Sequence, residues 1–87
     1  MEKYRILFKR SVSKDLRRLP GKDSAAILES VLHLAENPRP DGCEKLSAEE
    51  KYRIRQGVYR IIYEIRDKIL LVVVVKIAHR KEAYRRG

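Results

Sequence analysis

The sequence contains little cysteine and no long apolar run. Cys43 is the only cysteine, so the chain cannot form an internal disulfide, and one thiol cannot assemble a cysteine-based zinc site or an iron–sulfur cluster. The longest apolar run, residues 69–75, has seven residues, whereas a membrane-spanning helix needs about 20. The first ten residues mix charged with apolar side chains and lack the apolar centre of a secretory signal. We therefore expect a cytoplasmic protein with no membrane span, in which Cys43 is an inert loop thiol.

Acidic residues are scarce, and the shortage falls in the second part of the chain. The whole sequence has 21 Lys and Arg against 12 Asp and Glu, a formal net charge of +9. Residues 1–50 are nearly balanced, with ten basic and nine acidic residues, whereas residues 51–87 have eleven basic and three acidic ones. A basic field confined to one segment attracts polyanions, and no amphipathic apolar stripe accompanies it, so nucleic acid is favoured over a membrane. The alternative is a basic surface that serves only solubility.

Metal ligands are scarce in the basic segment as well. It has only three carboxylates, and no cluster of His, Asp and Glu shows the spacing of metal ligands. Phosphoryl transfer by two bound metal ions therefore does not fit this sequence. We expect a protein that uses no metal and no cofactor.

The chain is short enough that residues 1–87 are expected to form a single domain with one core. Apolar residues at every second position predict a strand at 4–8, and the helical period that follows predicts a helix at 11–19. Ser11 is a suitable N-cap for this helix, and Pro20 with the following glycine ends it.

A second helix and a loop follow. Asp23 is a suitable N-cap for the helix, which ends before Pro38 because a residue that precedes proline is disfavoured in the α region. Prolines, a glycine and several charges predict that residues 38–50 form a surface loop.

Three strands are predicted in the remaining sequence, at 52–55, 59–66 and 69–77, with Gly57 in the first of the two turns between them. The order of elements is therefore β-α-α-β-β-β. This order predicts an α+β fold in which the helix hairpin packs on one face of a four-stranded, largely antiparallel sheet.

Three arginines are expected on the other face of that sheet. On the strands predicted at 52–55 and 59–66, Arg53, Arg55 and Arg60 alternate with the apolar side chains that must meet the helices. Opposed or diagonal side chains on neighbouring strands lie within about 8 Å of each other. Three cations this close repel one another unless an anion lies among them, and a phosphodiester suits the planar fork of arginine. The alternative is that these arginines are ordinary solubilising or edge-protecting charges.

Two motifs resemble those of RelE-type toxins in the RelE/ParE superfamily. The first is Tyr-Arg-Ile-Arg-Gln-Gly-Val-Tyr-Arg-Ile-Ile-Tyr at 52–63, which follows a Leu-Ser pair at 46–47. The second is His-Arg-Lys-Glu-Ala-Tyr at 79–84. The Lys-Asp-Leu-Arg-Arg-Leu-Pro run at 14–20 is similar too, so the resemblance covers nearly the whole chain. Either motif alone is weak, but together, in this order and spacing, they are specific.

The resemblance implies the same β-α-α-β-β-β fold and the toxin component of a type II toxin–antitoxin system. It implies metal-independent cleavage of mRNA in the ribosomal A site, held in check by a cognate antitoxin. An acidic antitoxin would also be attracted to the basic segment.

The implied active-site residues have distinct roles. Arg60 would hold the scissile phosphate, Arg80 would offset charge at the phosphate or leaving oxygen, and Tyr84 would stack on or deprotonate at the 2′-hydroxyl. Arg53 and Arg55 complete the implied active site. The residues expected to bind RNA are Lys51, Arg53, Arg55, Lys76, Lys81, Arg85 and Arg86.

The general base is left open by the sequence. Well-studied members often carry Lys where this chain has Arg53 and Arg55, and arginine is a poor proton acceptor. Tyr84 and His79 are the two candidates for the base. With no metal site, the RNA's own 2′-hydroxyl is the expected nucleophile, and the products are a 2′,3′-cyclic phosphate and a 5′-hydroxyl.

Two other functions remain open at this point. Members of the ParE branch share the fold but poison DNA gyrase by binding it, and they usually lack the full set that Arg80 and Tyr84 complete here. A basic nucleic-acid-binding module without catalytic activity is the second alternative.

Overall fold

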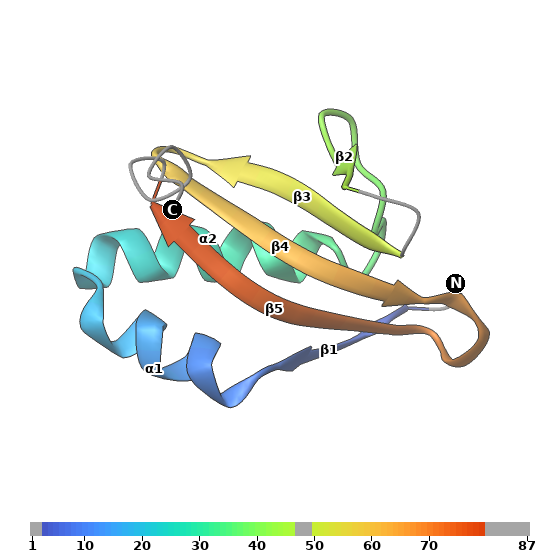
Figure 1. The fold of residues 1–87 in the computed structure, drawn as a ribbon, viewed down its shortest axis with the longest axis horizontal. Helices are drawn as coiled ribbons and strands as arrows, with labels where there is room; N and C mark the ends of the chain where they lie inside the picture. Colours follow the sequence, from blue (N-terminus) through green and yellow to red (C-terminus); the bar gives the residue numbers. More distant parts are fainter. Residues whose placement is uncertain (1–2, 47–49, 80–87) are drawn as a thin grey trace.

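The structure is a computed structural model that describes residues 3–46 and 50–79. The elements in chain order are β1 (Arg5–Phe8), α1 (Arg10–Arg18), α2 (Gly21–His33), β2 (Glu44–Lys45), β3 (Lys51–Gln56), β4 (Tyr59–Arg66), the 3-10 turn η1 (Asp67–Ile69) and β5 (Leu71–His79). The strands form one sheet in the order β1-β5-β4-β3-β2, in which β1 is parallel to β5 and the other neighbours are antiparallel (Figure 1). Both helices pack on one face, and we call the other the open face. The predicted α+β class is confirmed.

The sheet has five strands among the described residues, one more than the four predicted from the sequence. The additional strand, β2, lies within the segment predicted to be a loop, and it pairs Glu44 with Arg53 and Lys45 with Tyr52. Its two residues are both exposed. A strand of two exposed residues has no alternating pattern that a sequence could reveal, and it exists only because this segment lies alongside β3.

Both helices begin earlier than predicted, and neither uses the predicted side-chain cap. The N-cap of α1 is Lys9, so Ser11 lies inside the first turn. The N-cap of α2 is Pro20, and Asp23 lies inside the first turn, where its carboxylate accepts a hydrogen bond from the hydroxyl of Tyr59 at 3.0 Å. Only Leu19 and Pro20 separate the two helices, and the fixed φ of Pro20 suits the start of the second. No helix of the described residues is long and apolar enough to cross a membrane.

The strand bounds follow the prediction closely, with one difference at β5. The sequence predicts this strand from residue 69, whereas it begins at Leu71 and continues to His79. Residues 67–69 form η1, and Leu70 closes the turn with a φ of 51°. The sequence predicts a turn at residues 66–68, and the structure confirms one there, but the apolar residues that follow gave no sign that the turn continues to Leu70. Gly57, with a φ of 61°, occupies the predicted turn between β3 and β4.

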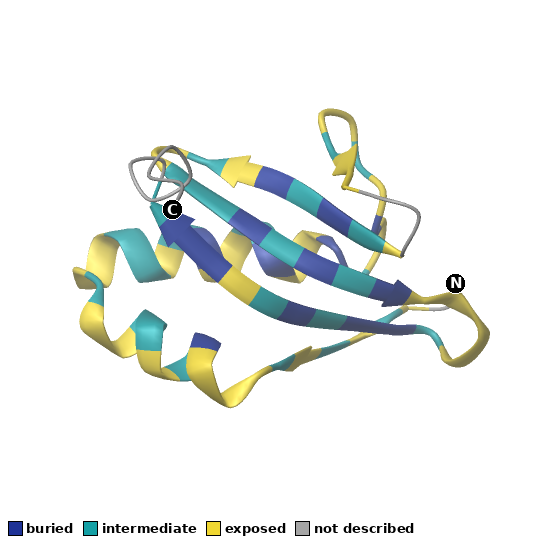
Figure 2. Ribbon diagram, viewed as in Figure 1, coloured by how far each residue is buried: buried dark blue, intermediate teal, exposed yellow. Residues whose placement is uncertain are grey.

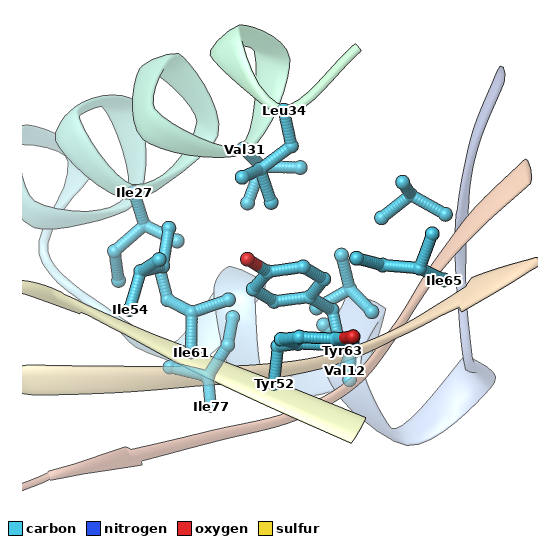
Figure 3. Close-up of a cluster of buried hydrophobic side chains, with 12 residues drawn as sticks. Val12, Ile27, Val31, Leu34, Tyr52, Ile54, Ile61, Tyr63, Ile65 and Ile77 are labelled. Atoms are coloured by element: carbon cyan, nitrogen blue, oxygen red, sulfur yellow. The ribbon is translucent and has the colours of Figure 1, made fainter. Parts of the chain in front are cut away.

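The core lies between the sheet and the helices. Buried residues alternate with more exposed ones along β3 and β4, as the period of a strand with one covered face requires (Figure 2). The hydroxyl of Tyr63, which is fully buried, donates a hydrogen bond to the backbone carbonyl of Pro38 at 2.7 Å. Burial raises the pKa of Tyr63, so the phenol stays neutral. The buried cluster consists of Val12, Ile27, Val31, Leu34, Tyr52, Ile54, Ile61, Tyr63, Ile65, Val72, Val74 and Ile77 (Figure 3).

A polar network, which we call the Asp67 clamp, joins the segment after α2 to the turn before β5. Arg39 donates from Nη1 and Nη2 to the two carboxylate oxygens of Asp67, at 3.2 and 2.9 Å. The hydroxyl of Tyr4 donates to the same carboxylate at 2.6 Å. Arg39 also lies over the ring of Tyr52, 5.2 Å from its centroid, and donates from Nε to its hydroxyl at 3.2 Å. The hydrogen bonds from Arg39 and then Tyr4 hold the pKa of Asp67 below its usual value.

Asp67→Asn tests the clamp through the dependence of stability on pH. A carboxylate whose pKa is lowered in the folded state stabilises the fold fully above its unfolded pKa, near about 4, and loses that contribution as the pH falls through the lowered value. Because the clamp is half exposed, we expect Asp67→Asn to cost about 1 kcal/mol or less at pH 7. The difference should shrink below about pH 3. Urea unfolding across this pH range measures it.

Asp41→Asn is the matched control, because Asp41 is exposed and forms no hydrogen bond or ion pair with a described residue. Equal destabilisation by the two substitutions, or a difference that persists unchanged at pH 2.5, would contradict a role for the charge of Asp67.

Candidate functional site

The open face carries two rows of side chains across the basic end of the sheet. In the first row, Arg55 on β3 lies opposite Arg60 on β4, and Arg60 lies opposite Ala78 on β5. Arg53 is diagonal to Arg60, within about 8 Å by strand geometry. The structure thus brings Arg53, Arg55 and Arg60 together, and we call them the arginine cluster. The second row contains, strand by strand, Glu44, Arg53, Ile62 and Lys76.

A carboxylate of the chain itself lies at the arginine cluster. Arg53 donates a hydrogen bond to Glu44 and forms an ion pair with it. The hydrogen bond and charge of Arg53, followed by the charges of Arg55 and Arg60, hold the pKa of Glu44 below its usual value. The Glu44 side chain is 55% exposed. An ionised, solvent-accessible carboxylate therefore offsets part of the repulsion among the three cations.

Glu44 is the residue of this site that sequence reasoning missed. The segment around it was predicted to be a surface loop, and a carboxylate in such a loop is unremarkable. The one signal was the expectation that an anion lies among three clustered arginines. That expectation did not identify the anion, because pairing between β2 and β3 is what positions Glu44.

A groove of about 490 Å³ opens beside the arginine cluster, between α2 and β3. Arg53, Arg55 and Glu44 border both the cluster and the groove, so the two are continuous. The groove combines apolar walls with a carboxylate, an imidazole and a hydroxyl. Its other principal lining residues are Ser30, His33, Leu34, Pro40, Asp41 and Ile54.

The other candidate residues within the described chain divide between the two faces of the sheet. Lys51 lies opposite Glu64, and Lys76 belongs to the second row, so by strand register both share the open face. His79 lies opposite Tyr59, on the face toward the helices, with the two rings edge to face and their centroids 5.5 Å apart. The placement of His79 therefore does not bring its imidazole into the arginine cluster.

Several predicted site residues lie outside the described residues. They are Arg80, Lys81, Tyr84, Arg85 and Arg86. Within 3–46 and 50–79, no group of three or more His, Cys, Asp and Glu side chains is arranged to hold a metal ion. The described side chains can supply phosphate binding and charge stabilisation from guanidinium groups, and proton transfer by a carboxylate.

Comparisons with known proteins agree on one family of toxins. Residues 6–84 match the family described as ParE toxin of type II toxin–antitoxin system, parDE. Toxin RelG of Mycobacterium tuberculosis is 33% identical over 86 residues, which cover 95% of this chain and 98% of that protein.

Two solved structures share the fold. The RelBE2 toxin–antitoxin complex of M. tuberculosis matches with a TM-score of 0.80 and 30% identity over 92% of this chain and 94% of that chain. The RelE–RelB complex of the archaeon Pyrococcus horikoshii matches with a TM-score of 0.81 and 30% identity over 88% and 94%.

Glu44→Gln tests whether the carboxylate competes for the arginine cluster. Removing its charge should raise the affinity for a short single-stranded DNA oligonucleotide, used as a polyanion, by roughly two- to fivefold at low salt. Fluorescence anisotropy at several salt concentrations measures the change. Glu29→Gln, on an exposed position of α2 outside the groove lining, removes the same charge and should have a smaller effect. Equal gains in the two variants would mean that only net charge matters.

Proposed function

This chain belongs to the RelE/ParE toxin superfamily, and from that premise we propose that it is a metal-independent endoribonuclease that cleaves mRNA in the ribosomal A site. It is a toxin of a type II toxin–antitoxin system. The observation that carries the nuclease proposal is the arginine cluster, in which two neighbouring strands present three guanidinium groups around one carboxylate. Such a cluster suits a phosphodiester, since guanidinium groups bind phosphate oxygens bidentately and keep their charge.

The arginine cluster would stabilise the negative charge that builds up on the phosphate during the reaction. In the proposed reaction, the 2′-hydroxyl gives its proton to a general base and its oxygen bonds to phosphorus. The bond to the 5′-oxygen breaks, this oxygen takes a proton from solvent water, and a 2′,3′-cyclic phosphate and a 5′-hydroxyl result. Arg60, with Arg55 opposite, holds the scissile phosphate and stabilises the additional negative charge of the transition state. The roles proposed for Arg80 at the leaving oxygen and Tyr84 at the ribose concern residues outside the described chain.

We assign the general base to Glu44. The 2′-hydroxyl must lose a proton, and arginine does not accept one. Among the described residues, Glu44 is the carboxylate that contacts the cluster, and His79 lies toward the helices. Tyr84, the other candidate from the sequence, lies outside the described residues. The cations lower the pKa of Glu44 and so keep it ionised. When a phosphate enters, its negative charge offsets those cations, which raises the affinity of the carboxylate for the proton.

An acidic cognate antitoxin is the proposed partner. The solved structures similar to this chain include complexes of RelE toxins with RelB antitoxins. The net charge of +9 favours binding of an acidic segment, and a carboxylate or other anion placed in the arginine cluster would exclude the RNA phosphate. In this proposal, the protein acts in the cytoplasm, where the ribosome and mRNA are found.

The match to the ParE toxin family favours one other function, a toxin that binds and poisons DNA gyrase. The two activities separate cleanly in parallel assays. A nuclease stops translation of an mRNA in a reconstituted system and leaves gyrase supercoiling unchanged, whereas a gyrase poison does the reverse. A nucleic-acid-binding module without catalysis would bind RNA, but it would cleave no mRNA and would leave gyrase supercoiling unchanged.

Arg60→Ala tests the phosphate-binding role. We expect cleavage of ribosome-bound mRNA to fall by about 10²- to 10³-fold, because an electrostatic donor to the transition state is lost. Mapping the mRNA ends and measuring translation give the rate. Arg66→Ala, at the opposite end of β4, is the matched control and should leave the rate within about twofold. Circular dichroism of both variants will show that they remain folded. Full activity of Arg60→Ala would remove the proposed role.

Glu44→Gln tests the proton-transfer role. Cleavage should fall by about 10²- to 10⁴-fold while binding of an RNA with 2′-O-methyl groups is retained or strengthened. A chelator should not change the rate of the unsubstituted protein, and a 2′-deoxy nucleotide at the cleaved position should abolish its reaction. Loss of activity in the chelator, or cleavage of the deoxy substrate, would rule out attack by the 2′-hydroxyl.

A further inference from the structure

We propose that Tyr59 is a positioning residue for the arginine cluster, because its hydroxyl joins the start of β4 to the carboxylate of Asp23 on α2. This inference rests on the proposed nuclease function and adds to it a residue that acts through Arg60 without contacting the substrate. Three observations carry it: the place of Tyr59 next to Arg60, the open edge of β3 beside them, and two polar contacts from one face of α2 to this end of the sheet.

Two neighbouring pairs of residues end the hairpin of β3 and β4, one pair on each face of the sheet. Arg55 lies opposite Arg60 on the open face, and the next pair, Gln56 opposite Tyr59, turns toward the helices. Beyond this pair only the short turn between the strands remains. Because Tyr59 and Arg60 are consecutive, the backbone that carries the phenol also sets the position from which the guanidinium group extends.

At this end of the sheet, β3 is held by a strand on one side. β2 pairs with β3 only at Tyr52 and Arg53, so residues 54–56 pair with β4 but with no second strand of the described chain. An edge with few contacts opens locally more easily than the centre of a sheet. Repulsion between Arg55 and Arg60, which Glu44 offsets in part, favours such a displacement. A contact that opposes it would keep the two guanidinium groups directed at one phosphate.

α2 supplies two such contacts from a single face. The hydroxyl of Tyr59 donates to a carboxylate oxygen of Asp23 at 3.0 Å, and the hydroxyl of Ser30 donates to the side-chain oxygen of Gln56. Asp23 and Ser30 are about two helical turns apart, and Ile27, which is fully buried in the core, lies between them on the same face (Figure 3). Apolar packing therefore holds α2 against the sheet, and the polar contacts on either side of it fix both members of the Gln56–Tyr59 pair.

The contact of Tyr59 is the stronger of the two, because its acceptor is a carboxylate. The hydrogen bond to Asp23, together with desolvation of the phenol, raises the pKa of Tyr59, so the hydroxyl keeps its proton and continues to donate near neutral pH. Tyr59 also contacts β5, where its ring lies edge to face with that of His79. It thus links α2, β4 and the end of β5 at one point, which is why the positioning role is assigned to Tyr59 and not to Gln56.

Tyr59→Phe tests this role, because it removes the hydroxyl and keeps the ring. We expect cleavage of ribosome-bound mRNA at saturating RNA to fall by about 10- to 100-fold, since a small displacement of a group that acts on the transition state has effects of this size. Binding of the 2′-O-methyl RNA, measured by fluorescence anisotropy, should change by less than about twofold, because every charge is still present.

Variants of Asp23 test whether the two residues act as one unit. Asp23→Asn keeps an oxygen that can accept from the phenol and should retain cleavage within about threefold, whereas Asp23→Ala should resemble Tyr59→Phe. Asp23→Ala combined with Tyr59→Phe should lose no more activity than either substitution alone, because both remove the same contact. Losses that multiply in the double variant would show that the two residues act separately, and would overturn the proposal.

Tyr4→Phe is the matched control. It removes the same kind of contact, a phenol hydroxyl bonded to a carboxylate, at the opposite end of the sheet. The ion pair of Arg39 with Asp67 remains in this variant, so the segment that carries Glu44 is still held. We expect Tyr4→Phe to lower the midpoint of thermal unfolding about as much as Tyr59→Phe and to leave cleavage within about twofold. Equal losses of cleavage in the two variants would mean that Tyr59 contributes only stability.

Binding of inorganic phosphate separates this inference from the nuclease proposal. A single phosphate needs converging guanidinium groups, whereas a long RNA gains from every cation of the surface. We expect Tyr59→Phe to weaken phosphate binding by about three- to tenfold, followed through the Nε–H resonances of Arg55 and Arg60, and Tyr4→Phe to leave it unchanged. If the unsubstituted protein cuts no RNA, the proposed function fails and this titration alone decides the role of Tyr59. Unchanged phosphate binding in Tyr59→Phe refutes the positioning role in either case.

Discussion

The register between β3 and β4 is the constraint on which the site depends. It sets Arg55 directly opposite Arg60, with Arg53 one diagonal step away. The same register turns Tyr52 and Ile54 toward the helices, where they are buried. A slip of one residue would exchange the two faces. Because burial of each large apolar side chain stabilises the fold by roughly 1.5–3 kcal/mol, the energy of the core also holds three mutually repelling cations side by side.

The segment between α2 and β3 supplies the acidic half of the site, and two buried or semi-buried contacts fix it. Tyr63 bonds the carbonyl of Pro38 from within the core, and Arg39 joins the Asp67 clamp. From these anchors the segment passes the edge of β3, where the two-residue strand β2 positions Glu44. The described part of this segment thereby has a defined path, because Pro38 and Arg39 are held by the core and by the Asp67 clamp, and Glu44 and Lys45 pair with β3.

The site combines opposite charges whose balance changes when a substrate enters. With no phosphate present, Glu44 offsets the repulsion within the arginine cluster. A phosphate would take over that electrostatic role and leave the carboxylate free to accept a proton in the proposed reaction. An acidic antitoxin segment would satisfy the same cations, which gives the partner and the substrate a common electrostatic basis.

The sequence by itself determined the α+β class, the order of the main elements, the bounds of β4, the turn at Gly57 and the face on which Arg53, Arg55 and Arg60 lie. All of these follow from local periodicity, since alternation along a strand decides which side chains share a face. The helix starts, which the structure corrected, have a local cause at Pro20, whose fixed φ suits the start of α2. Only the tertiary structure decided β2, the placement of Glu44 and the side of the sheet that His79 faces. Each of these depends on pairing or packing between residues distant in sequence, and such contacts leave no periodic pattern in the chain.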